Sequence, residues 1–184
     1  MSHFATLVLI NSRHANEPEK AVTKLLAPYN ENEDVENPRW DWWQIGGRWT
    51  GALDGYDPET DPLNRKVCTL CKGTGKRTDM VVAMVANGCN GCNGTGVETL
   101  WPTSWARHAG DLRPVSFVLD RIRSGAEVDV YAVVTPDGEW HARGEMGWFG
   151  ISRDDDDEQH WRETVRLLLE AHPKATAVMC DCHI

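Results

Sequence analysis

The sequence predicts an α+β domain that is interrupted by an inserted, metal-binding arm. An apolar run of strand length lies near the start of the chain, at residues 4–10, and an amphipathic stretch at 154–173 followed by an apolar run at 175–184 closes it. Between them the frame Cys-x-x-Cys-x-Gly-Thr-Gly occurs twice, at 68–75 and 89–96. Helical and strand patterns on both sides of a cysteine-rich stretch are typical of a mixed core with an insertion.

The first elements are a strand and a short helix. Residues 4–10, FATLVLI, form a continuous apolar run, which is the pattern of a strand buried on both faces. The next stretch predicts an amphipathic helix that ends near Pro28. Asn16 can cap this helix, Glu19 lies three residues later, and Pro18 suits the first turn. Its apolar face consists of Ala21, Val22, Leu25 and Leu26.

The second half predicts two helices, a hairpin and a closing strand. Residues 113–125 suit a short helix that ends at Gly125, and residues 128–144 place a Pro-Asp-Gly turn between two strand-like segments. The clearest helix lies within 154–173, where an aspartate caps the start and a proline follows the end. Its apolar stripe consists of Trp161, Val165, Leu168 and Leu169, and residues 175–184 form the last strand.

Without residues 30–125 the order is strand, helix, strand, strand, helix, strand, which is the ferredoxin-like split βαβ arrangement. In that fold the first strand pairs antiparallel with the last, so His3 is expected near His183. Another α+β sandwich with the same elements in a different order is the alternative. The expected organisation is an α+β core at 1–29 and 112–184, a Trp/Gly-rich loop region at 30–63, and an inserted zinc-binding arm at 64–111.

Four of the six cysteines have the spacing of metal ligands: Cys68, Cys71, Cys89 and Cys92. Each Cys-x-x-Cys can present two thiolates from one tight turn, and two such turns supply the four sulfurs that suit tetrahedral zinc. The start of the chain lacks the features of a secretory signal, so a disulfide framework is not expected. A site with four cysteines has no open coordination position, which favours a structural role for the ion.

The repeated frame resembles the cysteine-rich region of DnaJ-type (Hsp40) co-chaperones, in which Cys-x-x-Cys-x-Gly-x-Gly occurs four times and binds two zinc ions. The resemblance covers residues 68–96 and implies one zinc ion, held by the pair of repeats. The His-Pro-Asp sequence of the J-domain does not occur in the chain. The resemblance therefore carries over the ligand set and not the co-chaperone function.

The formal net charge of -9 argues against extensive binding of nucleic acid. The exception is residues 64–78, which contain five Lys and Arg residues and no carboxylate. Nucleic-acid binding is therefore not expected, except through the basic zinc arm. No run of 18 apolar residues exists, so no membrane span is predicted. Together with the missing secretory signal, this pattern predicts a cytoplasmic protein.

Tryptophan is concentrated in residues 38–53, PRWDWWQIGGRWTGAL, and a second stretch, GEMGWFGIS at 144–152, has a similar style. Indole faces, arginine and exposed glycine amides can together stack a base or sugar and hold a phosphate. The alternative is structural, because loops of this kind also cap a small sheet and anchor an inserted arm. The candidate ligand-binding residues are Trp40, Trp42, Trp43, Gly46, Gly47, Arg48, Trp49, His141, Trp148 and His183.

Three histidines are expected to converge at one end of the sheet: His3, His141 and His183. With Asp181 and Cys182 they suit a second metal site or an acid–base site, and packing or hydrogen bonding is the alternative interpretation. Strand alternation places Asp181 and His183 on one face of the strand and Cys180 and Cys182 on the other.

Over most of its length the chain resembles uncharacterised proteins of actinobacteria and their phages. The resemblance is carried by the stretches WDWWQIGGRW, GEMGWFG and DCHI. The resemblance names no activity, and it implies a small accessory protein that a phage could encode. A phage-encoded protein would lie in the cytoplasm of the host cell.

We expect a zinc-stabilised accessory binding protein that recognises a protein partner or a small nucleotide-like ligand through its Trp/Gly/Arg surface. Neither a Walker loop nor another catalytic signature occurs in the sequence. The alternative is a metal-dependent hydrolase that acts on a nucleotide or phosphoester, with His141, His183 and Asp181 as the acid–base group. The sequence predicts no oligomeric state.

Overall fold

The computed structural model describes residues 2–77, 88–146, 152–154 and 157–184 of the 184-residue chain. These residues divide into two compact units. The core unit consists of Met1–Tyr56 and Arg107–Ile184, and the arm unit consists of Asp57–Ala106. Among the described residues, no helix combines the length and the apolar character that a membrane crossing requires.

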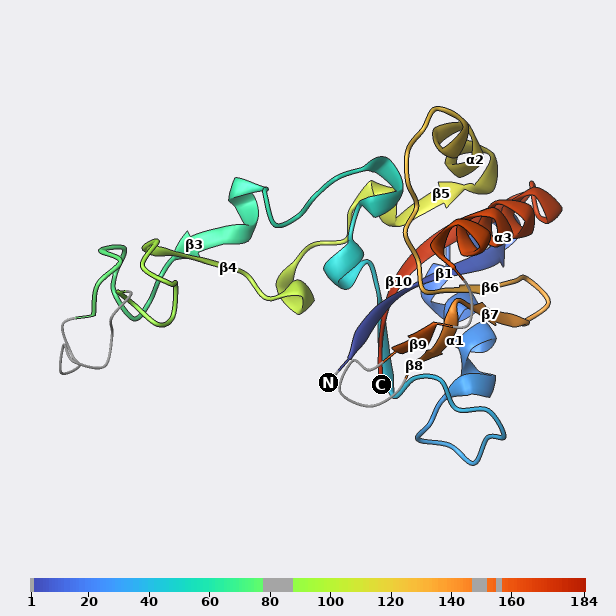
Figure 1. Ribbon diagram of the computed structural model, residues 1–184, viewed down its shortest axis with the longest axis horizontal. Helices are drawn as coiled ribbons and strands as arrows, with labels where there is room; N and C mark the ends of the chain where they lie inside the picture. The colour runs from blue at the N-terminus through green and yellow to red at the C-terminus, as the bar shows by residue number, and fades with distance from the viewer. Residues whose placement is uncertain (1, 78–87, 147–151, 155–156) are drawn as a thin grey trace. The chain divides into compact units, whose positions relative to one another are not determined.

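The core unit is built on a mixed sheet with the strand order β2-β10-β1-β6-β7, in which β5 also pairs with β10 (Figure 1). Its strands are β1 (His3–Asn11), β2 (Trp42–Ile45), β5 (Leu112–Pro114), β6 (Ala132–Val134), β7 (Trp140–Ala142) and β10 (Ala175–His183). A short hairpin of β8 (Gly144–Met146) and β9 (Ser152–Asp154) belongs to the same unit. The predicted α+β class is therefore confirmed.

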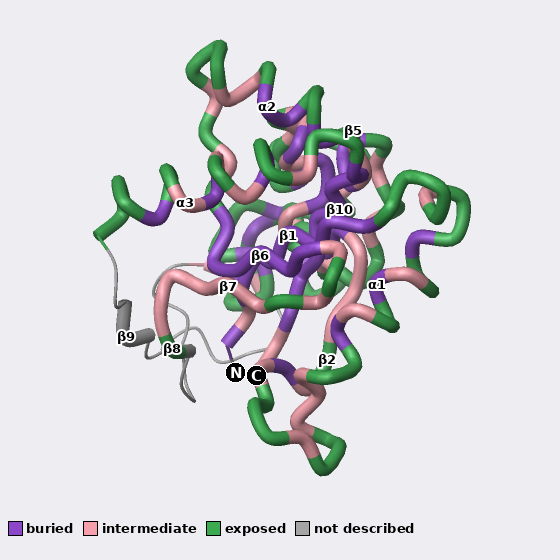
Figure 2. Tube along the Cα trace, turned by 90° about the vertical axis from the view of Figure 1, so that its right-hand side faces the viewer, coloured by how far each residue is buried: buried purple, intermediate pink, exposed green. Residues whose placement is uncertain are grey.

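The first and last strands form the centre of the sheet. They pair antiparallel along their whole length, from His3 opposite His183 to Asn11 opposite Ala175, which confirms the predicted pairing. Side chains 4–10 are all buried, and they alternate between two hydrophobic clusters on opposite faces of the sheet. Figure 2 shows this continuous buried centre in β1, β6 and β10. The apolar run FATLVLI thus lies between two layers of helices.

The ferredoxin-like order is not confirmed. In a split βαβ fold the second strand of the hairpin lies beside β1, whereas here the first hairpin strand, β6, pairs with β1 and runs parallel to it. The burial of the two strands explains the order, because β6 is fully buried and β7 is only half-buried. The more apolar strand occupies the inner position, and the strand containing Trp140 and His141 forms the edge.

Helices cover both faces of the sheet. The helix α1 (Pro18–Leu26) packs Val22 and Leu26 against one face. The helices α2 (Val115–Arg123) and α3 (Glu158–Ala171) pack against the other face. Single turns of 3₁₀ helix connect the elements at Ser12–His14, Ala27–Tyr29, Gly47–Trp49, Ala52–Asp54, Pro62–Asn64, Pro102–Ser104 and Ala109–Asp111.

The helix termini agree with the sequence in two cases and differ in one. Asp157 caps α3 by accepting a hydrogen bond of 2.9 Å from the backbone N–H of His160, as the aspartate run predicts. Gly125 follows α2 with a φ of 91°, a left-handed conformation that ends the helix. The predicted cap at Asn16 is wrong. The N-cap of α1 is Glu17, one residue later, and its side chain makes no capping hydrogen bond.

The segment 30–63, for which the sequence predicts a loop region, contributes β2 to the edge of the main sheet, where Cys180–His183 of β10 lie opposite Ile45–Trp42. In the arm unit, β3 (Arg65–Val67) and β4 (Val97–Thr99) form an antiparallel hairpin. The apolar run at 80–88, between the two cysteine frames, lies almost entirely outside the described residues.

Candidate metal centre and its surroundings

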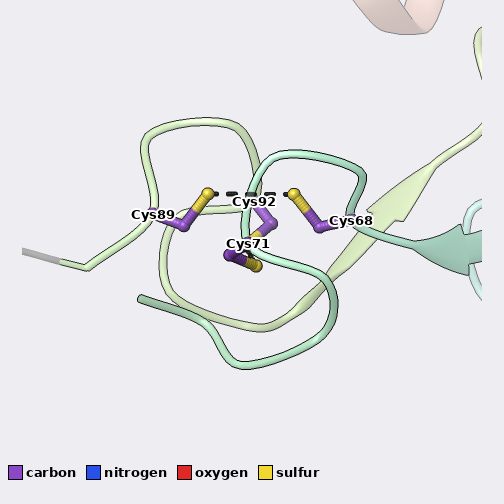
Figure 3. Close-up of side chains that lie close together, drawn as sticks. All are labelled: Cys68, Cys71, Cys89 and Cys92. Atoms are coloured by element: carbon purple, nitrogen blue, oxygen red, sulfur yellow. Dashed lines mark hydrogen bonds between the residues drawn. The ribbon is translucent and has the colours of Figure 1, made fainter. Parts of the chain in front are cut away.

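The four predicted metal ligands converge in the arm unit. The Sγ atoms of Cys68, Cys71, Cys89 and Cys92 all lie within 4.8 Å of one another, and all four residues are buried (Figure 3). The Cys68–Cys89 and Cys71–Cys92 Sγ separations are 3.8 and 3.7 Å. A tetrahedron with metal–sulfur bonds of about 2.3 Å has sulfur–sulfur edges of about 3.8 Å. The cluster could therefore hold a metal ion. All six cysteines are free thiols.

The repeated sequence frame produces a repeated structure. In each copy the threonine hydroxyl donates to the carbonyl oxygen of the second cysteine, at 2.7 Å for both Thr74 and Thr95. The two copies also exchange backbone hydrogen bonds, since Cys68 N–H donates to Gly96 O and Cys89 N–H donates to Gly75 O. The two turns are thus related by an approximate two-fold symmetry, which explains why the chain contains the same eight-residue frame twice.

The last glycine of each frame is required by a close backbone approach. A Cβ atom on Gly75 would lie 2.3 Å from Gly94 O, and a Cβ atom on Gly96 would lie 2.3 Å from Gly73 O. Both glycines also have positive φ angles, of 72° and 78°. A side chain at either position would therefore separate the two turns.

Hydrogen bonds prepare the thiols unequally for binding a metal. Burial acts to raise the pKa of Cys71, but hydrogen bonds led by the backbone N–H of Gly75 outweigh it and lower the pKa to about 7. Burial raises the pKa of Cys89 to about 11. In the second turn Gly96 N–H donates to Cys92 Sγ at 3.2 Å. A bound dication would draw protons from all four thiols, because thiolates are the metal-ligating form.

The tryptophans of residues 38–53 are mostly part of the core unit's packing. Trp40 is buried, and its Nε1–H donates to Leu26 O at 3.0 Å. Trp43 and Trp49 are half-buried against the two faces of the core. Trp42 is 37% exposed and is the one indole of these four that presents a large open face. Of the candidate ligand-binding tryptophans in this stretch, Trp42 is therefore the one available for stacking on a ligand.

The adjacent glycines approach the protein's own carboxylates. A Cβ atom on Gly46 would lie 2.7 Å from Asp111 Oδ2, and a Cβ atom on Gly47 would lie 2.5 Å from Asp181 Oδ2. The backbone N–H of Arg48 donates to the same Asp181 oxygen at 3.1 Å. The space beside these glycines, where the sequence predicts a ligand, is thus filled by buried aspartates. A ligand-binding role for these residues stays a prediction.

Asp111 is a buried structural residue near the site that has no signal in the sequence. It is fully buried, and its carboxylate accepts hydrogen bonds from the Thr50 hydroxyl at 2.9 Å and from the backbone N–H groups of Gly51 and His108 at 2.5 and 2.8 Å. Burial raises the pKa of this carboxyl. These contacts hold the segment that follows β2 in place, and a contact between residues 50 and 111 has no local sequence signal.

The segment after β2 is also held by an ion pair between Asp54 and Arg113, whose Nε and Nη2 atoms donate at 2.6 and 2.5 Å. The hydrogen bond to Arg113 lowers the pKa of Asp54. The stabilisation is therefore complete above the ordinary carboxyl pKa of about 4 and is lost as the pH falls through the lower folded-state pKa.

We expect Asp54→Asn to lower the free energy of unfolding at pH 7 by about 1–3 kcal/mol. At about pH 3 and below, the difference from the wild type should shrink, because the wild-type carboxyl also becomes neutral. Urea unfolding at both pH values measures this. Asp120→Asn is the matched control, since the Asp120–Arg123 pair is largely exposed and its loss should have little effect. An equal loss for Asp54→Asn at both pH values would contradict the ion-pair explanation.

Two of the three predicted histidines meet at the end of the sheet. The ring centroids of His3 and His183 are 4.9 Å apart. His3 Nδ1 is 2.7 Å from Asp181 Oδ1, and His183 Nδ1 is 2.6 Å from Asp41 Oδ1. The sequence predicted the approach of His3 and His183 and the participation of Asp181. It missed Asp41, although this residue lies between two of the tryptophans that were singled out.

The remaining candidates lie elsewhere. His141 is in the edge strand β7, where its Nε2 is 3.6 Å from Glu139 Oε2, and no described contact joins it to the other two histidines. Cys180 and Cys182 are fully buried on the opposite face of β10, and burial raises the pKa of both thiols. Trp148 lies outside the described residues.

Comparisons of the chain with family models, with curated proteins and with solved structures found no match. They therefore leave the resemblance of the repeats to the Hsp40 cysteine-rich region as an expectation.

Proposed function

We propose that the protein is a binding protein whose arm unit is folded by one structural zinc ion and contacts a protein partner. The four converging thiols support zinc, because a closed set of four thiolates suits a soft ion without redox chemistry. The ion would serve a structural role, since the four cysteines complete a tetrahedral shell and leave no position for a substrate.

The observation that supports a protein partner is the distribution of exposed apolar side chains. Of the eight large hydrophobic residues that are exposed in the described chain, five belong to the arm unit, which is the smaller of the two units. These five are Leu63, Val67, Leu70, Val97 and Trp101. Large exposed apolar side chains gathered on a small unit indicate an interaction surface rather than a chance distribution.

The hairpin of the arm gives this surface a defined centre. Val67 and Val97 are directly opposite each other on β3 and β4, and they are 64% and 41% exposed. On the other face of the hairpin, Lys66 pairs with Glu98 at 3.9 Å. The two valines thus form an apolar pair on one face of the hairpin, where Arg65 and Thr99 also lie, and the ion pair lies on the other face. Arg65 and Lys66 directly precede Val67 in β3, and residues 64–77 contain three further Lys and Arg residues. This charge favours a partner whose contact region combines apolar and acidic side chains.

We expect the pair of changes Val67→Thr and Val97→Thr to weaken binding of the partner by at least about tenfold, because two apolar side chains would lose their burial. The measurement is capture of crosslinked partners from cells that express the chain, followed by titration of the recovered partner against the purified protein. Threonine keeps the β-branched shape and suits an exposed strand, so the arm should keep its zinc ion.

Leu167→Thr is the matched control for this experiment. Leu167 is 52% exposed but lies in α3 of the core unit, so its replacement should leave partner binding unchanged. A partner that binds the double variant as well as the wild type, or that responds equally to Leu167→Thr, would show that the arm is not the contact surface. The recovered partner could instead bind through nucleic acid that it carries. If purified nucleic acid alone binds the arm with the same affinity, and if this affinity falls steeply with salt concentration, the arm contacts nucleic acid.

A second candidate function is a metal-dependent hydrolase that acts on a phosphoester. The specific observation in its favour is the pair of histidine–aspartate contacts at the end of the sheet. Turnover of nucleotides and phosphoesters that requires an added divalent metal and disappears in His183→Ala would support it.

A further inference from the structure

The arrangement of His3 and His183 provides a second ligand set in the core unit, separate from the four cysteines. Ser2 and Ile184 exchange both of their backbone hydrogen bonds, so the next pair along the ladder, His3 and His183, is a non-hydrogen-bonded pair. Side chains of such pairs lie closest together in an antiparallel ladder. The two imidazoles therefore project side by side from one face of the sheet, with ring centroids 4.9 Å apart.

The two aspartates select the tautomer of both rings in their neutral form. A carboxylate can only accept a hydrogen bond, so Nδ1 of His3 donates to Asp181 and Nδ1 of His183 donates to Asp41. Each neutral ring then presents its Nε2 as an unprotonated ligand atom. The hydrogen bonds of the two rings among the described residues are those of Nδ1. A carboxylate on Nδ1 with Nε2 left available is the usual arrangement of histidines that ligate a metal.

The charges of the site favour a cation. Two ionised carboxylates and two neutral imidazoles carry a net charge of about −2, and the ion pairs of Asp41 and Asp181 in the described chain are those with the two histidines. Asp181 is fully buried, and the two histidine side chains are 16% and 13% exposed. A divalent ion that reaches both Nε2 atoms would compensate this charge in a site partly shielded from water.

We propose that His3 and His183 together bind one divalent transition metal ion, through Nε2 of each ring, with Asp181 and Asp41 as the carboxylates that orient them. In the described residues, the four cysteines are the only group of three or more side chains that converges as a metal cluster. The histidine site thus offers two protein ligands, and water fills its other positions. Its affinity is weaker than that of the thiolate site, and its open positions can accept an oxygen atom of a bound molecule.

This proposal is independent of partner binding by the arm, and its test reads out metal alone. The full chain is first loaded with one equivalent of zinc and then titrated with Co²⁺, followed by calorimetry and by the visible absorption of cobalt. One further equivalent of Co²⁺ should bind with a d–d spectrum typical of nitrogen and oxygen ligands. The absence of a thiolate-to-cobalt charge-transfer band would show that the zinc at the cysteines has not exchanged.

His3→Ala and His183→Ala should each abolish the second equivalent and keep the first. Asp181→Asn should weaken the second equivalent by about 10–100-fold, because the imidazole loses its orienting carboxylate. His141→Ala is the matched control and should bind as the wild type does, since His141 is a half-buried histidine of β7 in the same unit. In the wild type, the imidazole protons of His3 and His183 should shift with Co²⁺, a readout that needs no variant to fold.

Failure to bind a second equivalent would overturn the proposal. A second equivalent that persists in both histidine variants, or that is lost in His3→Ala alone, would also overturn it, because the site requires both rings. Unshifted imidazole resonances in the wild type at saturating Co²⁺ would do the same. Partner capture by the arm would be unaffected by any of these outcomes.

Discussion

Replacement of Cys71 by alanine is expected to unfold the arm unit, residues 57–106, and to leave the core unit folded. Among the described residues, the buried cluster of the arm consists of the four cysteines themselves, so the proposed zinc ion would take the place of a core. Binding of structural zinc by such sites contributes about 10–16 kcal/mol of apparent free energy at neutral pH, which the arm cannot replace. Amide hydrogen exchange, resolved by residue, measures the effect.

The expected result is loss of protection at Cys68 and Cys89, whose backbone N–H groups donate to Gly96 O and Gly75 O, with unchanged protection in β1 and β10. Cys180→Ala is the matched control, because Cys180 is a buried cysteine of the core unit that takes no part in the cluster. This variant should lose stability by about 1–2 kcal/mol and keep the arm protected. Protection of the arm in Cys71→Ala would show that the arm folds without the metal site.

Gly47→Ala is expected to cost the core unit about 2–5 kcal/mol. The added Cβ would lie 2.5 Å from both Cβ and Oδ2 of Asp181, and the φ of 57° already disfavours a side chain. Asp181 is fully buried and bonded to His3, so it cannot move aside without breaking that contact. Urea unfolding followed by a signal from the core unit measures the loss.

Gly138→Ala separates steric overlap from backbone strain in this prediction. Gly138 has a φ of 93°, and no atom lies within 4 Å of the position that its Cβ would take. The change should therefore cost only about 1–2 kcal/mol, the strain of a left-handed residue. Equal losses for the two variants would contradict the close packing of Gly47 on Asp181.

Elements with strong local signals could be predicted from the sequence. FATLVLI is apolar at every position and forms the strand β1, and the capped, striped segment around Trp161 forms α3. The ligand set was predictable for a similar reason. Each Cys-x-x-Cys turn is local, and the repeated glycines and threonines in the same frame show that the two turns are built alike. Pairing of the first with the last strand followed from the order of the elements.

The features that could not be predicted depend on contacts between distant residues. The choice of β6 over β7 as the neighbour of β1 is decided by which strand is buried better once the sheet has formed. The glycines at 46 and 47 indicate that some group lies close to the backbone. The local sequence is the same whether this group is a ligand or a carboxylate of the protein. Asp111 and Asp181 lie more than 60 residues further along the chain, so the sequence could not show that these carboxylates occupy the position.

The most direct test of the central claim is the metal content of the freshly purified full chain, determined by elemental analysis together with the number of reactive thiols. The account predicts one zinc ion per chain and four thiols that react only after a chelator has removed the metal, with release of the arm's amide protection at the same step. Purified protein that contains no metal, while its arm is protected and its four clustered thiols are reduced, would contradict the account.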